Sequence, residues 1–140
     1  MDKLIAMLKR HEGAETHVYM CTEDRYTIGV GRNVDPRGGL GLSEDEIEYL
    51  LSNDILRCIK ELSKEYRWFG DLDNIRQEAV IDVFFCLGAT SFRTFSKMIK
   101  AFENADHKEA SIQLLDSRFA KQTGRRAIEL SAMIETGSYV

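Results

Sequence analysis

The sequence predicts an α+β fold that is mostly helical, in which a small N-terminal β-hairpin lobe is joined by a long helix to a helical C-terminal lobe, with a cleft between the lobes. Residues 16–34 alternate enough around the turn TEDR to predict a hairpin or a small sheet. Ser43 and Glu46 form a capping-box pattern, which predicts a helix running from there to about Ser63. From Asp73 onward, the helical pattern predominates.

The remaining elements follow from the same kinds of pattern. A short helix is expected over residues 1–11, because Leu4, Ile5 and Leu8 share one face, and Gly13 ends or bends it. The segment DPRGGLG after the hairpin is expected to be a loop. Later helices are predicted over residues 73–87, 95–103, 107–115 and 123–135, with a turn over residues 88–94.

Composition and charge restrict the class of protein. A single proline and 44% apolar residues in a chain of 140 argue against disorder. The 19 basic and 23 acidic residues give a net charge of −4, which disfavours binding to nucleic acid. The cysteines form no CxxC pair and the histidines are scattered, so no metal site is expected. Cys58 and Cys86 stand at apolar helical spacing and are predicted to be small, reduced core residues.

The segment from Glu12 to Gly31, EGAETHVYMCTEDRYTIGVG, carries the candidate chemistry. It places the carboxyl of Glu12, the thiol of Cys21 and the hydroxyl of Thr27 on a helix end followed by a hairpin. Cleavage of a glycosidic bond needs an acid for the leaving oxygen and a second group on the opposite face of the sugar. Taken singly, Glu12 is better explained as a solvated helix-end residue, because the chain has many glutamates, and Thr27 is a weak signal, because threonine is common in strands.

This segment resembles the phage lysozymes of the T4 type, glycoside hydrolase family 24, in which a glutamate, an acidic residue and a threonine recur at these spacings. Glu12 and Thr27 match, while Cys21 stands where many members have aspartate, although cysteine is also found there. The resemblance covers nearly the whole chain. LSEDEIEYLLSNDI is similar to the start of the family's long connecting helix, RQEAVIDVFFCLGATSFRTFSKM to its central buried helix, and DSRFAKQTGRRAIEL to a segment that faces the cleft.

The resemblance implies one lysozyme-like domain over residues 1–140. Within it, residues 12–42 form the β-containing lobe, 43–63 the connecting helix, and 1–11 together with 64–140 the helical lobe. The implied activity is that of a muramidase, which hydrolyses the β-1,4 bond between N-acetylmuramic acid and N-acetylglucosamine. The reaction is expected to invert the anomeric carbon and to need no cofactor.

The resemblance also implies roles for single residues. Glu12 is the general acid, and Thr27 holds the attacking water together with Cys21. A thiol with an ordinary pKa of about 8.5 is only a few per cent thiolate at neutral pH, so Cys21 is a weak base unless that pKa is lowered. Asp24 is the fallback carboxylate. The positions implied to line the saccharide groove or to orient Glu12 are Asn33, Phe85, Gln113 and Arg126, with Arg125 and Gln122 as weaker candidates.

Two other functions remain open. In a cysteine-dependent wall amidase or peptidase, His17 would serve Cys21 as base, but residues four apart in a strand lie roughly 13 Å from each other. A catalytically impaired relative would bind peptidoglycan without cutting it. In either case residues 1–13 lack the pattern of a secretory signal, and no apolar run is long enough to cross a bilayer.

These observations and the resemblance together give the expected partners and location. We expect a monomer without a membrane anchor, held in the host cytoplasm until a separate phage pore protein, a holin, gives it access to the periplasm and the cell wall. The partner there is the peptidoglycan glycan strand. Because peptidoglycan is itself anionic, the net charge of −4 would give binding little electrostatic help.

Overall fold

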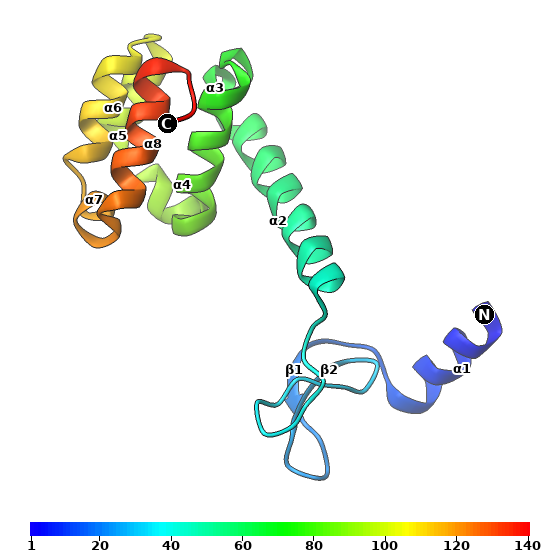
Figure 1. Ribbon diagram of the computed structural model, residues 1–140. Coiled ribbons are helices and arrows are strands. Elements are labelled where there is room, and N and C mark those ends of the chain that lie inside the picture. The colour runs from blue at the N-terminus through cyan, green and yellow to red at the C-terminus, as the bar shows by residue number, and fades with distance from the viewer. The chain divides into compact units, whose positions relative to one another are not determined.

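A computed structural model describes residues 1–140, and the chain divides into two compact units, Met1–Leu50 and Leu51–Val140. Figure 1 shows their helices and strands. The predicted α+β class is confirmed, because helices make up most of the chain and the only sheet is small and antiparallel. The boundary between the units falls inside the long helix α2 (Glu44–Glu65). The assignment of residues 1–11 to the helical lobe stays a prediction.

The first unit contains one helix, a three-stranded sheet and the first residues of α2. The helix α1 spans Asp2–Glu12 and ends at Gly13, whose φ of 80° favours glycine. The antiparallel strands run in the order β1-β2-β3, with bounds Glu15–Met20, Tyr26–Gly29 and Arg32–Asn33. Thr27 in the central strand pairs with Tyr19 on one side and Asn33 on the other. The predicted helix and hairpin are therefore confirmed, and a short third strand is added to them.

The helix α2 begins with the predicted capping box. The backbone N–H of Ser43 donates to Glu46 Oε1 at 3.0 Å, and the N–H of Glu46 donates to Ser43 Oγ at 3.2 Å. The guanidinium of Arg32 reaches the same Glu46 oxygen at 2.8 Å and also donates to the Gly41 carbonyl at 3.0 Å. One carboxylate thus accepts from both β3 and the start of α2, so these contacts fasten the sheet to the helix start.

The second unit is helical. Besides the rest of α2 it contains α3 (Arg67–Asp71), α4 (Asn74–Arg93), α5 (Ser96–Glu103), α6 (His107–Leu115), α7 (Arg118–Thr123) and α8 (Arg125–Thr136). The helix α8 packs against α4, α6 and α7, and α5 packs against α6 (Figure 1). The core gathers around the buried ring of Phe92, which contacts the rings of Tyr66, Phe84 and Phe95.

The turn predicted over residues 88–94 is confined to Gly88 and Thr94, and residues 89–93 continue α4 after a kink. Gly88 alone leaves the helical conformation, with φ 78° and ψ 167°, and the helix resumes after it to bury Phe92 completely. The sequence also gave no sign of α3 and α7, because helices of five and six residues are too short to show an apolar repeat. No single helix is long and apolar enough to span a bilayer, whereas α4 and α5 taken together, bent by 104°, meet that length and composition.

The prediction that Cys86 is a core residue is wrong, because its side chain is exposed. The buried face of α4 is formed by Ala79, Val80, Val83 and Phe84. Cys86 follows two residues after Phe84, which puts it about 200° around the helix axis from that side chain. Cys58 is partly buried against the core, closer to the prediction, and all three cysteines are free thiols.

Candidate active site

Glu12 is the last residue of α1, and its carboxylate lies against the turn between β2 and β3. A Cβ atom built on Gly31 would stand 3.2 Å from Glu12 Oε2, and the φ of 67° at Gly31 itself favours glycine. The Glu12 side chain is exposed to solvent. A side chain at position 31 would crowd this carboxylate, so the glycine leaves Glu12 free to meet a ligand beside the sheet.

Cys21 opens the tight turn between β1 and β2. Its backbone N–H donates to the Arg25 carbonyl at 3.0 Å, and its own carbonyl accepts from the Asp24 N–H at 3.0 Å. The backbone N–H groups of Glu23 and Arg25 in this turn hold the pKa of the Cys21 thiol below its ordinary value, against partial desolvation and the negative charge of Glu23. The thiolate is therefore more populated near neutral pH than in a free cysteine.

Thr27 is buried in the central strand, and its hydroxyl belongs to the same polar group as Cys21. Oγ1 donates its only proton to the Arg25 carbonyl at 2.9 Å, the same carbonyl that accepts from the Cys21 N–H at 3.0 Å. A hydroxyl oxygen keeps two lone pairs when its proton is given away. Thr27 can therefore accept a hydrogen bond from a water molecule beside the sulfur, as its predicted role requires.

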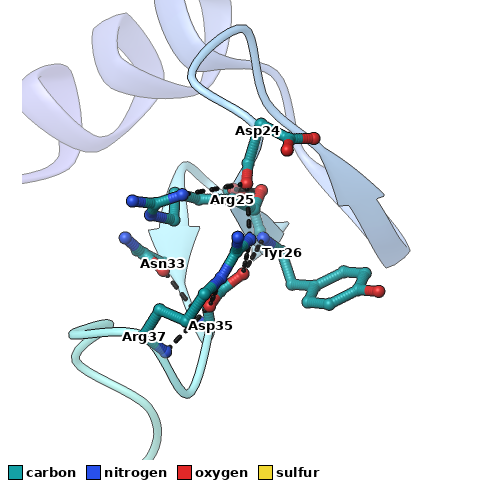
Figure 2. Close-up of polar contacts among 7 residues, drawn as sticks. Asp24, Arg25, Tyr26, Asn33, Asp35 and Arg37 are labelled. Carbon is teal, nitrogen blue, oxygen red and sulfur yellow. Dashed lines mark hydrogen bonds and ion pairs between the residues drawn. The ribbon is translucent and has the colours of Figure 1, made fainter.

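The two other candidate partners of Cys21 make different contacts. The Nδ1 atom of His17 lies 2.9 Å from the hydroxyl of its neighbour Thr16. Asp24 has a left-handed φ of 61°, and Figure 2 shows its carboxylate pointing away from the polar cluster that holds its carbonyl. Neither side chain is among the groups that set the pKa of Cys21. The Thr27 hydroxyl and the Cys21 N–H donate to the same Arg25 carbonyl, so the geometry favours Thr27 over both as the neighbour of Cys21.

Asn33 on β3 is partly engaged within its own unit. Its Oδ1 accepts from the backbone N–H of Asp35 at 2.9 Å, and its carbonyl accepts from the Gly41 N–H at 3.1 Å. The side-chain NH₂ is the group left to donate to a sugar hydroxyl. The saccharide-binding role of Asn33 stays a prediction.

The other predicted residues belong to the second unit, where they line two separate pockets. Phe85 is 45% exposed and, with Arg126, lines a groove of about 480 Å³ in which Arg126 Nε donates to Asp82 Oδ1 at 2.7 Å. Gln113 and Gln122 line a pocket of about 630 Å³ formed by α4, α5, α6 and α7, and Gln113 donates to Glu109 at 2.7 Å. Contact between these side chains and a saccharide, or between Arg126 and Glu12, stays a prediction.

The sequence analysis missed Asp35, which is the only charged residue buried in the chain. Its carboxylate accepts hydrogen bonds from the backbone of Tyr26 and from both the backbone and the guanidinium of Arg37 (Figure 2). The Arg37 side chain first, and then the Tyr26 N–H, hold the pKa of Asp35 well below its usual range. In the sequence, the Asp-Pro pair at Asp35 indicates a turn, but it does not indicate that the aspartate side chain is buried.

The first unit is expected to lose stability in acid. Arg32, and then Ser43, lower the pKa of Glu46 to about 2, whereas an unfolded glutamate has a pKa of about 4.3. The stabilisation from Glu46 is therefore fully present above about pH 4.3 and fades as the pH falls toward 2, with Asp35 acting in the same direction. Thermal melts between these pH values will show a falling midpoint in the parent and a shallower fall in Glu46→Gln. Equal slopes in the two proteins would contradict the assignment.

The helices and the small antiparallel sheet are those of an α+β protein of the lysozyme type. The phage lysozyme family model matches residues 9–133. Probable T4-type lysozyme 2 of Dictyostelium discoideum is 28% identical over 164 residues, covering 99% of this chain and 96% of the relative. An endolysin of Acyrthosiphon pisum secondary endosymbiont phage 1 is 26% identical over 125 residues, covering 89% and 84%. The chain belongs to the phage lysozyme family, which confirms the resemblance.

Proposed function

We propose that the protein is a muramidase that hydrolyses the β-1,4 bond between N-acetylmuramic acid and N-acetylglucosamine in bacterial peptidoglycan. Membership of the phage lysozyme family supports a glycoside hydrolase. The observation that carries the proposal is the Cys21 thiol, held in a turn of backbone N–H donors beside the Thr27 hydroxyl and carried by the same unit as Glu12. In this proposal the Cys21 thiolate is the base and the Thr27 hydroxyl holds the attacking water.

The proposed reaction is a single displacement by water. Glu12, protonated, gives its proton to the leaving glycosidic oxygen as the bond to the anomeric carbon breaks. On the opposite face of the sugar a water donates one hydrogen bond to Thr27 Oγ1, and the Cys21 thiolate takes the water's other proton as its oxygen attacks the anomeric carbon. The step leaves a Glu12 carboxylate, a neutral Cys21 thiol and an inverted sugar. Exchange of one proton with solvent at each group restores the starting state.

The first sugar product is expected to be the α anomer. An attack by water from the face opposite the leaving group inverts a β linkage, and the acid and base of such enzymes lie about 6.5–9.5 Å apart to leave room for that water. Proton NMR of a soluble glycan digest, recorded before mutarotation, distinguishes the two anomers. A product that is β at first would instead indicate direct attack by the thiolate and a covalent intermediate.

A catalytically impaired, peptidoglycan-binding relative is the second candidate. It is favoured by the thiol at position 21, where the resemblance leads one to expect a carboxylate in many members. Incubation of the purified protein with purified peptidoglycan separates the candidates. A muramidase releases reducing ends, an amidase or peptidase releases amino groups, and a binding protein sediments with the wall and releases neither. Release of amino groups alone, or binding without products, would overturn the proposal.

A further inference from the structure

We propose that Asp35 and Arg37 form a clamp that positions the Cys21 thiol and the Thr27 hydroxyl for the reaction without touching the substrate. The clamp consists of these two side chains, and it acts on the two consecutive peptide groups that join Asp24 to Arg25 and Arg25 to Tyr26. The inference rests on the proposed function, since it concerns the groups that would hold and deprotonate the attacking water. Figure 2 shows the contacts of the clamp.

The peptide group between Asp24 and Arg25 is held at its carbonyl end by Arg37. Arg37 Nη2 donates to the Asp24 carbonyl oxygen at 2.7 Å. In a trans peptide the carbonyl and the N–H point in opposite directions, and the chain contains no cis peptide. The N–H of this same group, that of Arg25, is one of the two backbone groups that lower the pKa of the Cys21 thiol. By fixing one end of the plane, Arg37 aims the other end at the thiol.

The next peptide group, between Arg25 and Tyr26, is held at its N–H end by Asp35. The Tyr26 N–H donates to Asp35 Oδ2 at 3.0 Å. The carbonyl at the opposite end, that of Arg25, accepts from the Thr27 hydroxyl at 2.9 Å and from the Cys21 N–H at 3.0 Å. Asp35 thus fixes the plane whose far end orients both functional residues.

Asp24 has an uncommon backbone conformation that the clamp helps to hold. A φ of 61° lies in the left-handed region, which residues other than glycine adopt less often. The Arg37 contact to the Asp24 carbonyl, with the Cys21–Asp24 backbone hydrogen bond, keeps the residue in this conformation. The Asp24 carbonyl also accepts from Arg25 Nη1 at 3.2 Å, so we expect the loss of Arg37 to loosen the turn and to shift the Arg25 N–H relative to the sulfur.

The clamp itself is held rigidly. Asp35 Oδ1 accepts from the Arg37 backbone N–H at 2.8 Å and from Arg37 Nε at 2.9 Å, while Oδ2 also accepts from Nη2 at 3.0 Å. The Asp35 carbonyl accepts from the Gly39 N–H at 2.8 Å. A Cβ on Gly39 would lie 2.5 Å from both the Asp35 carbonyl and Asn33 Oδ1, so the loop is closed too tightly for any other residue. Because the Asp35 carboxylate is buried and accepts this many hydrogen bonds, its position and orientation are fixed.

The chain offers a matched control for the clamp. Arg32, in the same unit, likewise joins a carboxylate, that of Glu46 at 2.8 Å, to a backbone carbonyl, that of Gly41 at 3.0 Å. It contacts no residue of the turn that holds Cys21 and Thr27. Each of the two substitutions, Arg37→Gln and Arg32→Gln, therefore removes one guanidinium that contacts a carboxylate and a backbone carbonyl. Only Arg37→Gln removes a group from the clamp.

The test uses the full chain with Cys58→Ser and Cys86→Ser, so that Cys21 is the only thiol. The rate of its alkylation by iodoacetamide is measured from about pH 5 to pH 10, a span that brackets an ordinary thiol. We expect Arg37→Gln to move the midpoint of this profile to higher pH and to lower kcat roughly ten- to a hundredfold with little change in KM. Arg37→Lys keeps the positive charge but lacks the several N–H donors of a guanidinium. Its alkylation midpoint and its kcat are expected to lie between those of the parent and those of Arg37→Gln.

The charged groups around the turn are Glu23, Asp24 and Arg25, which lie within it, and the clamp beside it. Because Arg37→Gln also removes a positive charge, Arg32→Gln tests whether loss of charge alone shifts the alkylation midpoint of Cys21. Arg32→Gln is expected to lower the melting temperature and leave the alkylation midpoint of Cys21 where it was. The proposal is overturned if Arg37→Gln or Arg37→Lys melts lower but keeps the parental midpoint and kcat. If the parent releases no reducing ends, the proposed function is wrong, whereas the alkylation profiles still report whether the clamp sets the thiol.

Discussion

Glu12→Gln is expected to slow the lysis of permeabilised Gram-negative cells by about 10²–10⁴-fold, the usual contribution of a general acid. Glutamine has the shape of glutamate but cannot supply a carboxyl proton to the leaving oxygen. No residue of α1 is buried, so the exchange leaves the cores of the units intact. Loss of turbidity over time measures lysis, and far-ultraviolet circular dichroism checks the fold.

Glu15→Gln is the matched control for this prediction. Glu15 is an exposed glutamate on β1, three residues further along the chain, and removing its charge changes the net charge by the same amount. It is expected to lyse cells at about the parental rate. If Glu12→Gln also lysed cells at that rate with an unchanged spectrum, the acid would have to be another residue.

Cys21→Ala is expected to remove most of the activity, by about 10²-fold or more, whereas Cys21→Asp is expected to keep or raise it. Alanine offers neither a base nor an acceptor for the surrounding N–H groups. Aspartate, with a reference pKa of about 3.9, is ionised at neutral pH. The N–H donors of Glu23 and Arg25 that favour the thiolate would also favour a carboxylate. Rates of reducing-end release from peptidoglycan compare the three proteins.

The pH dependence gives the same prediction a second readout. If the thiolate is the working form, activity of the parent rises with pH through the titration of Cys21, whose pKa is already lowered by the turn, until Glu12 loses the proton that it must donate. Cys21→Asp moves this rising limb to lower pH. Iodoacetamide inactivates the parent and spares the aspartate variant. Because Cys86 is exposed, both proteins need Cys86→Ser for this comparison.

Two outcomes would contradict the role of Cys21. A fully active Cys21→Ala would make the thiol a bystander, and Asp24 would become the first carboxylate to test in its place. If the alanine and aspartate variants were both inactive although folded, the thiol would have a role that a carboxylate cannot fill. Direct attack on the sugar would then have to be reconsidered.

Much of the fold could be predicted because its signals are local. The capping box of Ser43 and Glu46 lies within one helical turn, and its two hydrogen bonds are present as the spacing implies. The sequence shows where α4 is interrupted, at Gly88, but not how many residues leave the helix, because a single glycine can interrupt a helix that then continues. The exposure of Cys86 depends on which face of α4 packs inward, and apolar neighbours on both sides do not decide that.

The site was less predictable, since its contacts join residues far apart in sequence. Asp35 contacts Tyr26 nine residues away, and Arg37 contacts Asp24 thirteen residues away, through a loop whose closure no periodic pattern reveals. The lowered pKa of Cys21 likewise depends on the backbone N–H groups of Glu23 and Arg25, which only the folded turn brings near the thiol. Glu12, Cys21 and Thr27 were found through a family resemblance, because each of them alone is an unremarkable residue in its element.

The identity of the sugar at each new reducing end tests the central claim most directly. Purified peptidoglycan is digested with the parent and with Glu12→Gln, reduced with borohydride, and its fragments are analysed by mass spectrometry. The proposed muramidase predicts that reduced N-acetylmuramic acid accumulates in the parent digest and is nearly absent from the Glu12→Gln digest. Reduced N-acetylglucosamine, cleaved wall peptides without new reducing ends, or equal yields from the two proteins would contradict it.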